Sequence, residues 1–332
     1  MFTVMLKIPI AAAAILACAS SAGAQPLVHT YSIVARDPAS GELGVAVQSH
    51  WFSVGSIVTW AEAGVGAVAT QSFVDPAYGP RGLELMRSGV PAPDALRQLV
   101  AKDAQRDGRQ VAMIDAAGRV SAYTGRSAIA AAGHYAGQNF SVQANMMANA
   151  SVWPAMREAF ESSKGDLADR MLAALEAAEK AGGDVRGRQS AAILIVKAKG
   201  TGRPWAGADR LFDLRVEDHP APVDELRRLM RLQRAYAHAN RGDELMTEQK
   251  VDLALTEYEA ASRLAPEIVE LPFWHAVTLA SIGREAEALP IFEAVFAKEP
   301  VWAELLERLP AAGLFPNDRA LIERIKALSP KS

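Results

Sequence analysis

Cysteine is almost absent from this sequence, whose 332 residues include one, Cys18. A disulfide framework needs at least two cysteines, and zinc-ribbon and iron–sulfur frameworks need several, so all of these are excluded within a single chain. The sequence also lacks the G-x-S-x-G elbow, the H-E-x-x-H zinc motif and the P-loop, and its six histidines are scattered without metal-ligand spacing. We accordingly expect no metal site and no cofactor.

The sequence has neither a basic excess nor a long apolar run. Lys and Arg number 35 against 38 Asp and Glu, the net charge is −3, and no basic arm is present, so we expect no nucleic-acid partner. The N-terminal apolar run, Ile8–Ala17, is about ten residues long, whereas a transmembrane helix needs about 20. With 50% hydrophobic and 22% charged residues, the chain can bury a sizeable core, and its length predicts two domains.

Residues 1–24 are typical of a signal peptide. Lys7 gives a short positive start, Ile8–Ala17 is apolar, and small residues lead to an A-x-A-like cleavage point after Ala24. We therefore expect an exported protein, either periplasmic or secreted. Cys18 also stands in a context similar to the lipobox of bacterial lipoproteins, so a lipid anchor through Cys18 is the alternative.

Between residues 27 and 222, blocks of predicted strands alternate with blocks of predicted helices. Short alternating or apolar runs predict strands, and 3.6-residue spacing predicts helices. The arrangement indicates an α+β fold, in which helices layer on antiparallel sheets. The predicted strands are Tyr31–Ala35, Leu43–Val47, Gly66–Thr70, Gln110–Ile114, Arg119–Tyr123 and Ala191–Val196, and the predicted helices are Arg81–Lys102 with a break at Gly89–Pro91, Val152–Ser162 and Asp166–Ala181.

From Val223 onward the pattern is almost entirely helical and contains a repeat. Four residues recur 34 positions later, which is the tetratricopeptide period, so we expect residues 223–332 to form an all-α, tetratricopeptide-like domain. Because fewer than three repeats rarely stand alone, helices over Asp224–Asn240 and Asn317–Leu328 are expected to support it. Arg241–Val251 is predicted to be an extended segment between helices. The recurring residues are Ala254, Tyr258, Ala261 and Pro266, matched by Ala288, Phe292, Val295 and Pro300.

Polar residues recur at four predicted strand ends, within apolar and glycine-rich surroundings. A single amide or hydroxyl at such a position is usually satisfied by sheet-edge hydrogen bonds, but four groups favour a shared polar site. The four segments are Gln48–His50, Thr70–Ser72, Ser141–Met146 and Gly182–Ala191.

These segments, together with several others, resemble a family of N-terminal-nucleophile (Ntn) hydrolase-like proteins catalogued as domain of unknown function 1028. The resemblance covers about residues 27–232, and the glycine–aspartate–arginine–glutamine run near residue 186 makes it specific. The matching stretches are Thr30–Asp37, Gly44–Ser49, Ala63–Gln71, Tyr78–Leu83, Gln143–Met146, Gly183–Ala191 and Asp213–Pro220.

The resemblance implies a four-layer αββα sandwich over residues 25–222, in which helices cover two antiparallel sheets. It also implies that the first residue of the mature chain is the nucleophile and that its own α-amine, which titrates near ~7.7, is the base. The position that matches the family's start is Thr30, with Ser32 as the fallback hydroxyl. Cleavage after Ala24 leaves Gln25–His29 in front of that threonine, so a second cut is required to free its amine.

The other candidate residues follow from the same resemblance and from their chemistry. Asn145 and Gln71 are uncharged donors at strand ends, suited to hold an oxyanion or to orient the nucleophile. The arginines and the aspartate of the last polar segment could recognise a substrate carboxylate or orient the nucleophile; alternatively, Asp184 and Arg186 pair with each other or with neighbours. The predicted substrate-binding residues are Gln48, Asp184, Arg186, Arg188 and Gln189.

Two functions remain open on the sequence alone. The first is an exported amidohydrolase that cleaves the C–N bond of a small amide or peptide through an acyl-enzyme. The second is a non-catalytic exported protein for binding or assembly, which holds a protein partner on its helical repeats and in which Thr30 is an ordinary β-branched strand residue. Sandwiches of this type often self-associate, so a homodimer is compatible with both.

Overall fold

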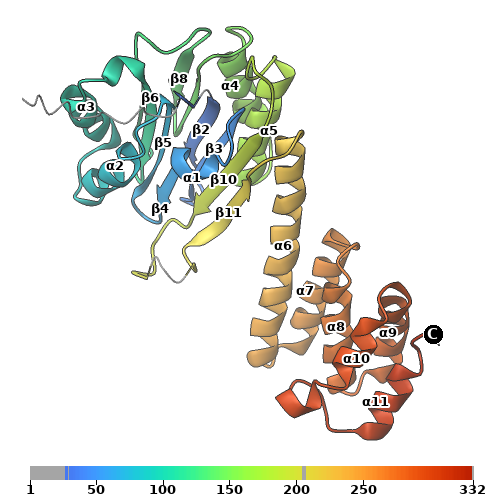
Figure 1. Ribbon diagram of the computed structural model, residues 1–332. Coiled ribbons are helices and arrows are strands. Elements are labelled where there is room, and N and C mark those ends of the chain that lie inside the picture. Colours follow the sequence, from blue (N-terminus) through green and yellow to red (C-terminus); the bar gives the residue numbers. More distant parts are fainter. Residues whose placement is uncertain (1–26, 29, 204–206, 331–332) are drawn as a thin grey trace, which may run out of the picture.

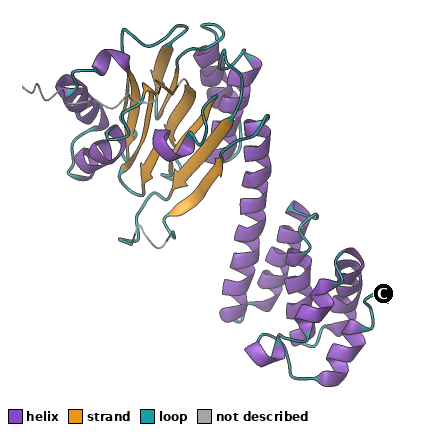
Figure 2. Cartoon of the chain, in the orientation of Figure 1, coloured by secondary structure: helices purple, strands orange, loops and turns teal. Residues whose placement is uncertain are grey.

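The structure, a computed structural model, describes residues 27–28, 30–203 and 207–330. It contains a mixed α/β domain built on antiparallel sheets, followed by a C-terminal region of helices (Figures 1 and 2). The predicted α+β class and the helical tail are therefore confirmed. The predicted signal peptide, residues 1–24, and Cys18 lie outside the described residues.

A six-stranded antiparallel sheet carries the strand that begins at Thr30. Its order is β11 (Arg210–Val216), β10 (Ser190–Val196), β3 (Leu43–Ser49), β2 (Thr30–Arg36), β9 (Phe140–Ala144) and β8 (Gly133–Gly137). In this register Thr30 lies opposite Ser49, and Ser49 lies opposite Ser190. Three hydroxyl residues therefore share one row at the end of the sheet.

The five-stranded sheet begins immediately before β2 in the sequence. Its order is β1 (Leu27–Val28), β5 (Gly66–Phe73), β6 (Arg109–Asp115) and β7 (Val120–Thr124), and β4 (Thr59–Glu62) also pairs with β5. Strands β1 and β2 are one residue apart in the chain, yet they belong to different sheets. The chain therefore passes from one sheet to the other directly before Thr30.

The two sheets pack face to face, with an apolar layer at one end of the interface and polar side chains at the other. Alternate strand residues share a face, so Ala67 and Ala69 of β5 lie on the same face as Gln71. The two alanines belong to the apolar layer between the sheets, whereas the glutamine is buried among polar partners. In β6, Ala112 also belongs to that layer and Gln110 to the polar end.

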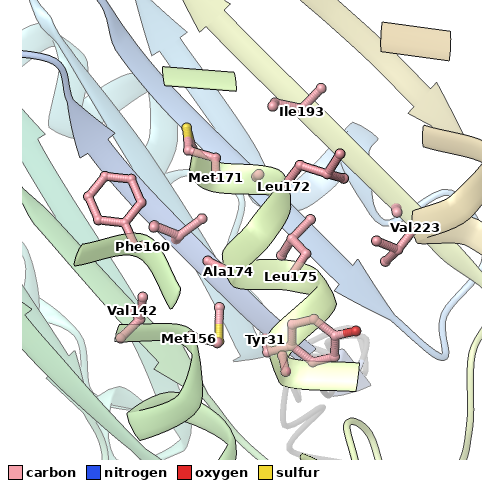
Figure 3. Close-up of a cluster of buried hydrophobic side chains, with 14 of the residues drawn as sticks. Tyr31, Val142, Met156, Phe160, Met171, Leu172, Ala174, Leu175, Ile193 and Val223 are labelled. Carbon is pink, nitrogen blue, oxygen red and sulfur yellow. The ribbon is translucent and has the colours of Figure 1, made fainter. Parts of the chain in front are cut away.

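Helices cover the outer face of each sheet. Helices α4 (Val152–Ser162) and α5 (Leu167–Lys180) pack on the six-stranded sheet, and α2 (Tyr78–Arg87) and α3 (Ala92–Lys102) pack on the five-stranded one. Figure 3 shows the first of these layers, where Leu175 and Met156 lie near Tyr31. The order of layers is helix, sheet, sheet, helix (Figure 1). A short helix, α1 (Gly55–Val58), precedes β4.

The long helix α6 (Pro222–Thr247) joins the sandwich to the helical tail (Figure 1). Its first turns are buried on the six-stranded sheet, and the rest packs against the next helix along the chain. The predicted extended segment Arg241–Val251 is therefore wrong up to Thr247. The segment remains helical because Leu245 is buried. Gly242 also leaves room for the Tyr258 ring, since a Cβ atom on residue 242 would lie 2.5 Å from that ring. The residues buried on the sheet are Val223, Leu226 and Met230.

The tail consists of helices that pack against their neighbours in the chain. They are α7 (Val251–Leu264), α8 (Glu270–Ser281), α9 (Glu285–Lys298), α10 (Val301–Leu306) and α11 (Arg319–Lys326). The repeated small and aromatic residues fall on α7 and α9, where all of them are buried. The sequence repeat thus corresponds to equivalent packing positions on two alternate helices.

Truncation of a core side chain should destabilise the sandwich. Leu175 is fully buried between α5 and the six-stranded sheet, so Leu175→Ala should lower the free energy of unfolding by about 2–5 kcal/mol through lost apolar burial and the remaining cavity. Val185→Ala is the matched control, because that side chain is 60% exposed and should change stability by less than about 0.5 kcal/mol. Urea denaturation of both variants measures the difference, and equal losses would contradict this account of the core.

The first turns of α6 should contribute to the thermal stability of the sandwich. A chain that ends after Ala221 loses the buried side chains of the first turns of α6, whereas a chain that ends after Ala239 keeps them. We expect the shorter chain to melt at least about 5 °C lower, because each lost side chain contributes roughly 1.5–3 kcal/mol. Circular dichroism melting curves compare the two, and coincident curves would show that α6 adds nothing to the sandwich.

Candidate functional site

Thr30 begins β2 in the interior of the sandwich. Its side chain is fully buried, and its hydroxyl donates a hydrogen bond to the Ser49 hydroxyl at 3.1 Å. In this chain its backbone nitrogen is joined to His29 by a peptide bond. A peptide nitrogen has no basic lone pair, so the base of the implied mechanism is not present until that bond is cut.

The structure brings Gln71 and Asn145, the two other predicted catalytic residues, to Thr30. The Gln71 side-chain amide donates to the Thr30 carbonyl oxygen at 3.1 Å, and the Asn145 amide does so at 3.4 Å. Both amides also donate to the Oε1 atom of Gln110, at 2.6 and 2.9 Å. Residues from three strands and the segment after β9 therefore meet around one backbone carbonyl.

A second half of the same network surrounds Ser32. Its hydroxyl donates to Gln71 Oε1 and accepts from Gln143 Nε2, both at 2.6 Å. The Oε1 atom of Gln143 in turn accepts from the Ser141 hydroxyl at 3.0 Å. The hydroxyl of Ser32, the fallback nucleophile, therefore forms hydrogen bonds with two side-chain amides. We call the whole set the inter-sheet cluster, and its members are Thr30, Ser32, Ser49, Gln71, Gln110, Ser141, Gln143 and Asn145.

Gln110 was not among the predicted site residues, although it connects the cluster. Its Oε1 accepts from two amides, and its Nε2 donates to the carbonyl of Ala144 at 2.9 Å and to the Thr124 hydroxyl at 2.9 Å. The available sequence signal was a polar residue at an inward position of an otherwise apolar strand, Gln110–Ile114. Gln143 lies within the predicted polar segment Ser141–Met146, for which the sequence indicates no separate role of this residue.

Gln71 and Asn145 are each followed by a residue whose backbone is in the left-handed region. Ser72, after Gln71, has φ 71°, and Met146, after Asn145, has φ 55°. Such a conformation costs a non-glycine residue roughly 1–3 kcal/mol, and it is concentrated at functional sites. The backbone is thus bent immediately after each donor.

The predicted substrate-binding residue Gln48 lies on the other face of the six-stranded sheet. It is paired in register with Tyr31 and shares its face toward the helices, where both side chains are buried. The Gln48 amide atoms and the Tyr31 hydroxyl have no hydrogen-bond partner among the described residues. Burial raises the pKa of Tyr31, and it also raises the pKa of the nearby Glu179 carboxyl. Gln48 therefore cannot contact a molecule bound to the inter-sheet cluster.

Asp184 and Arg186 form an ion pair with each other, as one of the two alternatives predicted. The Asp184 carboxylate is fully shielded, lies 2.7 Å from the guanidinium, and also accepts from the backbone nitrogen of His50 at 3.1 Å. Arg188 is half-exposed and lies 3.6 Å from Glu179. The segment they occupy leads into β10 at the row of hydroxyls that contains Thr30.

The remaining predicted residue, Gln189, is half-buried. Its backbone carbonyl accepts from the backbone nitrogen of His219 at 2.7 Å. Together with the preceding ion pair, this contact holds residues 184–189 at the rim of the cluster. These residues thus shape the edge of the site more than its interior.

Ionisable groups are excluded from the inter-sheet cluster itself, whose members are amides and hydroxyls. Within the described part of the chain, no three His, Cys, Asp or Glu residues come together in a way that could hold a metal ion. No described helix combines the length and the apolar character needed to cross a membrane. The chemistry available at the cluster is therefore hydrogen bonding and hydroxyl nucleophilicity.

Fold and site together define a mixed α/β protein with a neutral polar cluster buried between two antiparallel sheets. The model of a family of unknown function, DUF1028, matches residues 30–226, and the chain belongs to this family. The crystal structure of protein SPO2555 from Silicibacter pomeroyi, assigned to the same family, is similar with a TM-score of 0.55 and 32% identity, over 60% of this chain and 84% of that chain. No curated protein matches.

Loss of the connecting amide should destabilise the sandwich. Gln110→Leu removes the acceptor shared by Gln71 and Asn145, and the expected loss of unfolding free energy is about 1–3 kcal/mol, the usual penalty for buried polar groups that lose a partner. Gln189→Leu is the control, because its side chain is half-buried at the rim. Urea denaturation distinguishes them; if both variants lose the same stability, the cluster does not depend on Gln110.

Proposed function

We propose that this protein is an N-terminal-nucleophile hydrolase of an amide bond, with Thr30 as the nucleophile after the chain before it has been removed. The observation that carries the proposal is the position of Thr30, which begins an inner strand within a cluster of neutral donors. The layer order of helix, sheet, sheet and helix supports assignment of residues 25–222 to the four-layer Ntn-hydrolase-like fold.

The proposed reaction uses atoms of Thr30 for both nucleophile and base. The hydroxyl oxygen attacks the amide carbonyl, and the freed α-amine takes the hydroxyl proton. Collapse of the tetrahedral intermediate breaks the C–N bond, and the same amine gives its proton to the departing nitrogen. Water then attacks the threonyl ester, its proton passes through the amine to the threonine oxygen, and the carboxylic acid leaves.

Gln71 and Asn145 are the proposed orienting residues. Their amides donate to the Thr30 carbonyl, so they fix the backbone of the nucleophile. Gln110 holds both amides by accepting from them. Each amide directs its N–H groups to these two partners, so the proposed role is to orient the nucleophile, and donation to a developing oxyanion would require one of these hydrogen bonds to be exchanged.

Processing is proposed to open the site as well as to create the amine. Strand β1 pairs with Ser72 and Phe73 on an edge of β5, next to Gln71, and Thr30 is shielded from solvent. A cut between His29 and Thr30 releases β1 from covalent attachment to the nucleophile. Loss of β1 then exposes the end of β5 beside the cluster.

Export and the helical tail complete the proposal. We assign residues 1–24 as the signal peptide of a periplasmic or secreted protein, with a lipid anchor at Cys18 as the alternative. Residues 223–332 are proposed to be tetratricopeptide-like and to hold a protein partner, because the 34-residue repeat falls on equivalent buried positions of α7 and α9. The same self-associating fold class is the basis for proposing a homodimer.

The burial and the internal hydrogen bonds of the inter-sheet cluster support a second candidate function. The hydrogen bonds of Gln71, Gln110 and Gln143 connect their side-chain amides to one another and to nearby groups, and Thr30 is buried. A fully engaged polar layer is also what a stable, non-catalytic scaffold requires. In that case the chain would be an exported binding or assembly protein whose helical tail holds the partner.

Mass spectrometry of the exported protein tests the catalytic proposal. We expect a mature chain that starts at Thr30 and that forms a covalent adduct on this residue with a β-lactone, an electrophile that acylates N-terminal hydroxyl nucleophiles. Thr30→Ala should abolish the adduct and lower turnover of any amide substrate at least about a thousandfold, because the nucleophile is lost. Thr30→Ser should retain labelling.

Thr256→Ala is the matched control, since this hydroxyl lies on the exposed face of α7, and its labelling should equal that of the unaltered protein. A mature chain that keeps residues before Thr30 and takes up no β-lactone would overturn the catalytic proposal. The binding or assembly function would then be favoured.

A further inference from the structure

The helical tail contains a pocket that the proposed hydrolase chemistry does not use. It lies between α6 and α8, has a volume of about 410 Å³, and is lined by three aromatic and two acidic side chains among other residues. This volume falls in the range of about 300–1,000 Å³ that is typical of small-molecule sites. We call it the acidic aromatic pocket, and the residues that define it are Tyr236, Asp243, Tyr258, Glu270 and Trp274.

Helical spacing places the pocket residues of α6 on one face of that helix and those of α8 on one face of the other. Tyr236 and Asp243 are seven residues apart on α6, and Glu270 and Trp274 are four residues apart on α8, so each pair shares one helix face. Tyr258 enters from α7, against the space left by Gly242. The pocket is thus built by three helices and does not depend on a single loop.

The aromatic residues hold the two carboxylates in place. The Tyr236 hydroxyl donates to Glu270 Oε2 at 3.0 Å, and the Trp274 indole donates to Glu270 Oε1 at 3.4 Å. The Tyr258 hydroxyl donates to Asp243 Oδ1 at 2.7 Å. Neutral donors orient the acids without cancelling their charge.

Charge balance at the pocket differs from that of the surrounding surface. Neither Asp243 nor Glu270 forms an ion pair with any residue in the described part of the chain. Nearby acids do so: Glu267 pairs with Arg231, and Glu244 pairs with Arg241. Two negative charges therefore face a common cavity without a positive partner, beside aromatic rings.

We propose that the acidic aromatic pocket binds an arginine or lysine side chain of a partner polypeptide. A guanidinium or ammonium group would form charge-assisted hydrogen bonds with the two carboxylates, and the ring faces would add cation–π attraction. A polypeptide is the proposed source because the rim is apolar and exposed: Leu314 is 55% exposed and Tyr236 is 38% exposed. Residues that flank the basic side chain can cover this rim, which a free cation would leave in water.

Calorimetric titration of the full chain with short peptides tests this site. The probes are acetyl-Gly-Leu-Arg-Leu-Gly-amide and the same peptide with citrulline, which keeps the shape of arginine but is neutral. The arginine peptide should bind at least about tenfold more tightly, because it alone gains charge-assisted bonds. It should also bind more tightly than N-acetyl-arginine amide, which cannot cover the rim.

Isosteric variants separate the pocket from general surface charge. Glu270→Gln and Asp243→Asn should each weaken the arginine peptide about tenfold, since each removes one carboxylate and keeps the shape. Glu293→Gln removes the same charge from an exposed position on α9 and should leave binding unchanged. Unchanged melting curves show that the variants are folded.

Three results would overturn the proposal. They are the absence of saturable binding by the arginine peptide, equal affinity for the citrulline peptide, and equal weakening by Glu293→Gln. If N-acetyl-arginine amide binds as tightly as the peptide, the polypeptide source is wrong. The Thr30 variants test a different site, so failure of either proposal leaves the other standing.

Discussion

Hydrogen bonding among buried neutral side chains is the constraint on which the sandwich depends. The amides of Gln71, Gln110 and Asn145 lie between two sheets and are shielded from solvent, so each must find its partners within the protein. A one-residue slip of β5 or β6 would turn its glutamine to the opposite face and leave the other amides unpaired. The network therefore fixes how the two sheets are paired.

The same constraint explains why charge is kept at the rim. An unpaired charge between the sheets would carry a large desolvation cost, and the cluster contains amides and hydroxyls instead. Asp184, a buried acid in the segment before β10, is paired with Arg186 and accepts hydrogen bonds from backbone nitrogens. A neutral interior of this kind is compatible with the proposed acyl chemistry at a hydroxyl.

Helix α6 connects two regions of different chemistry. Its first turns complete the apolar core of the sandwich, and its last turns contribute one wall of the acidic aromatic pocket. The polar cluster of the sandwich is neutral, whereas the pocket of the tail carries two acids. Helix α6 thus joins the sandwich that contains the neutral cluster to the tail that contains the acidic pocket.

The local sequence determined those helices and helix ends that depend on neighbouring residues alone. Gly89–Pro91 ended one helix and began another, and the 34-residue repeat marked equivalent helices. The local sequence did not determine which polar residues meet, because their meeting depends on strand register and on which sheet each strand joins. Gln48 and Thr30 are both polar residues of the same sheet, yet they lie on opposite faces. Tertiary packing also decided that Arg241–Thr247 remains helical, since the burial of Leu245 outweighs the local preference for a turn.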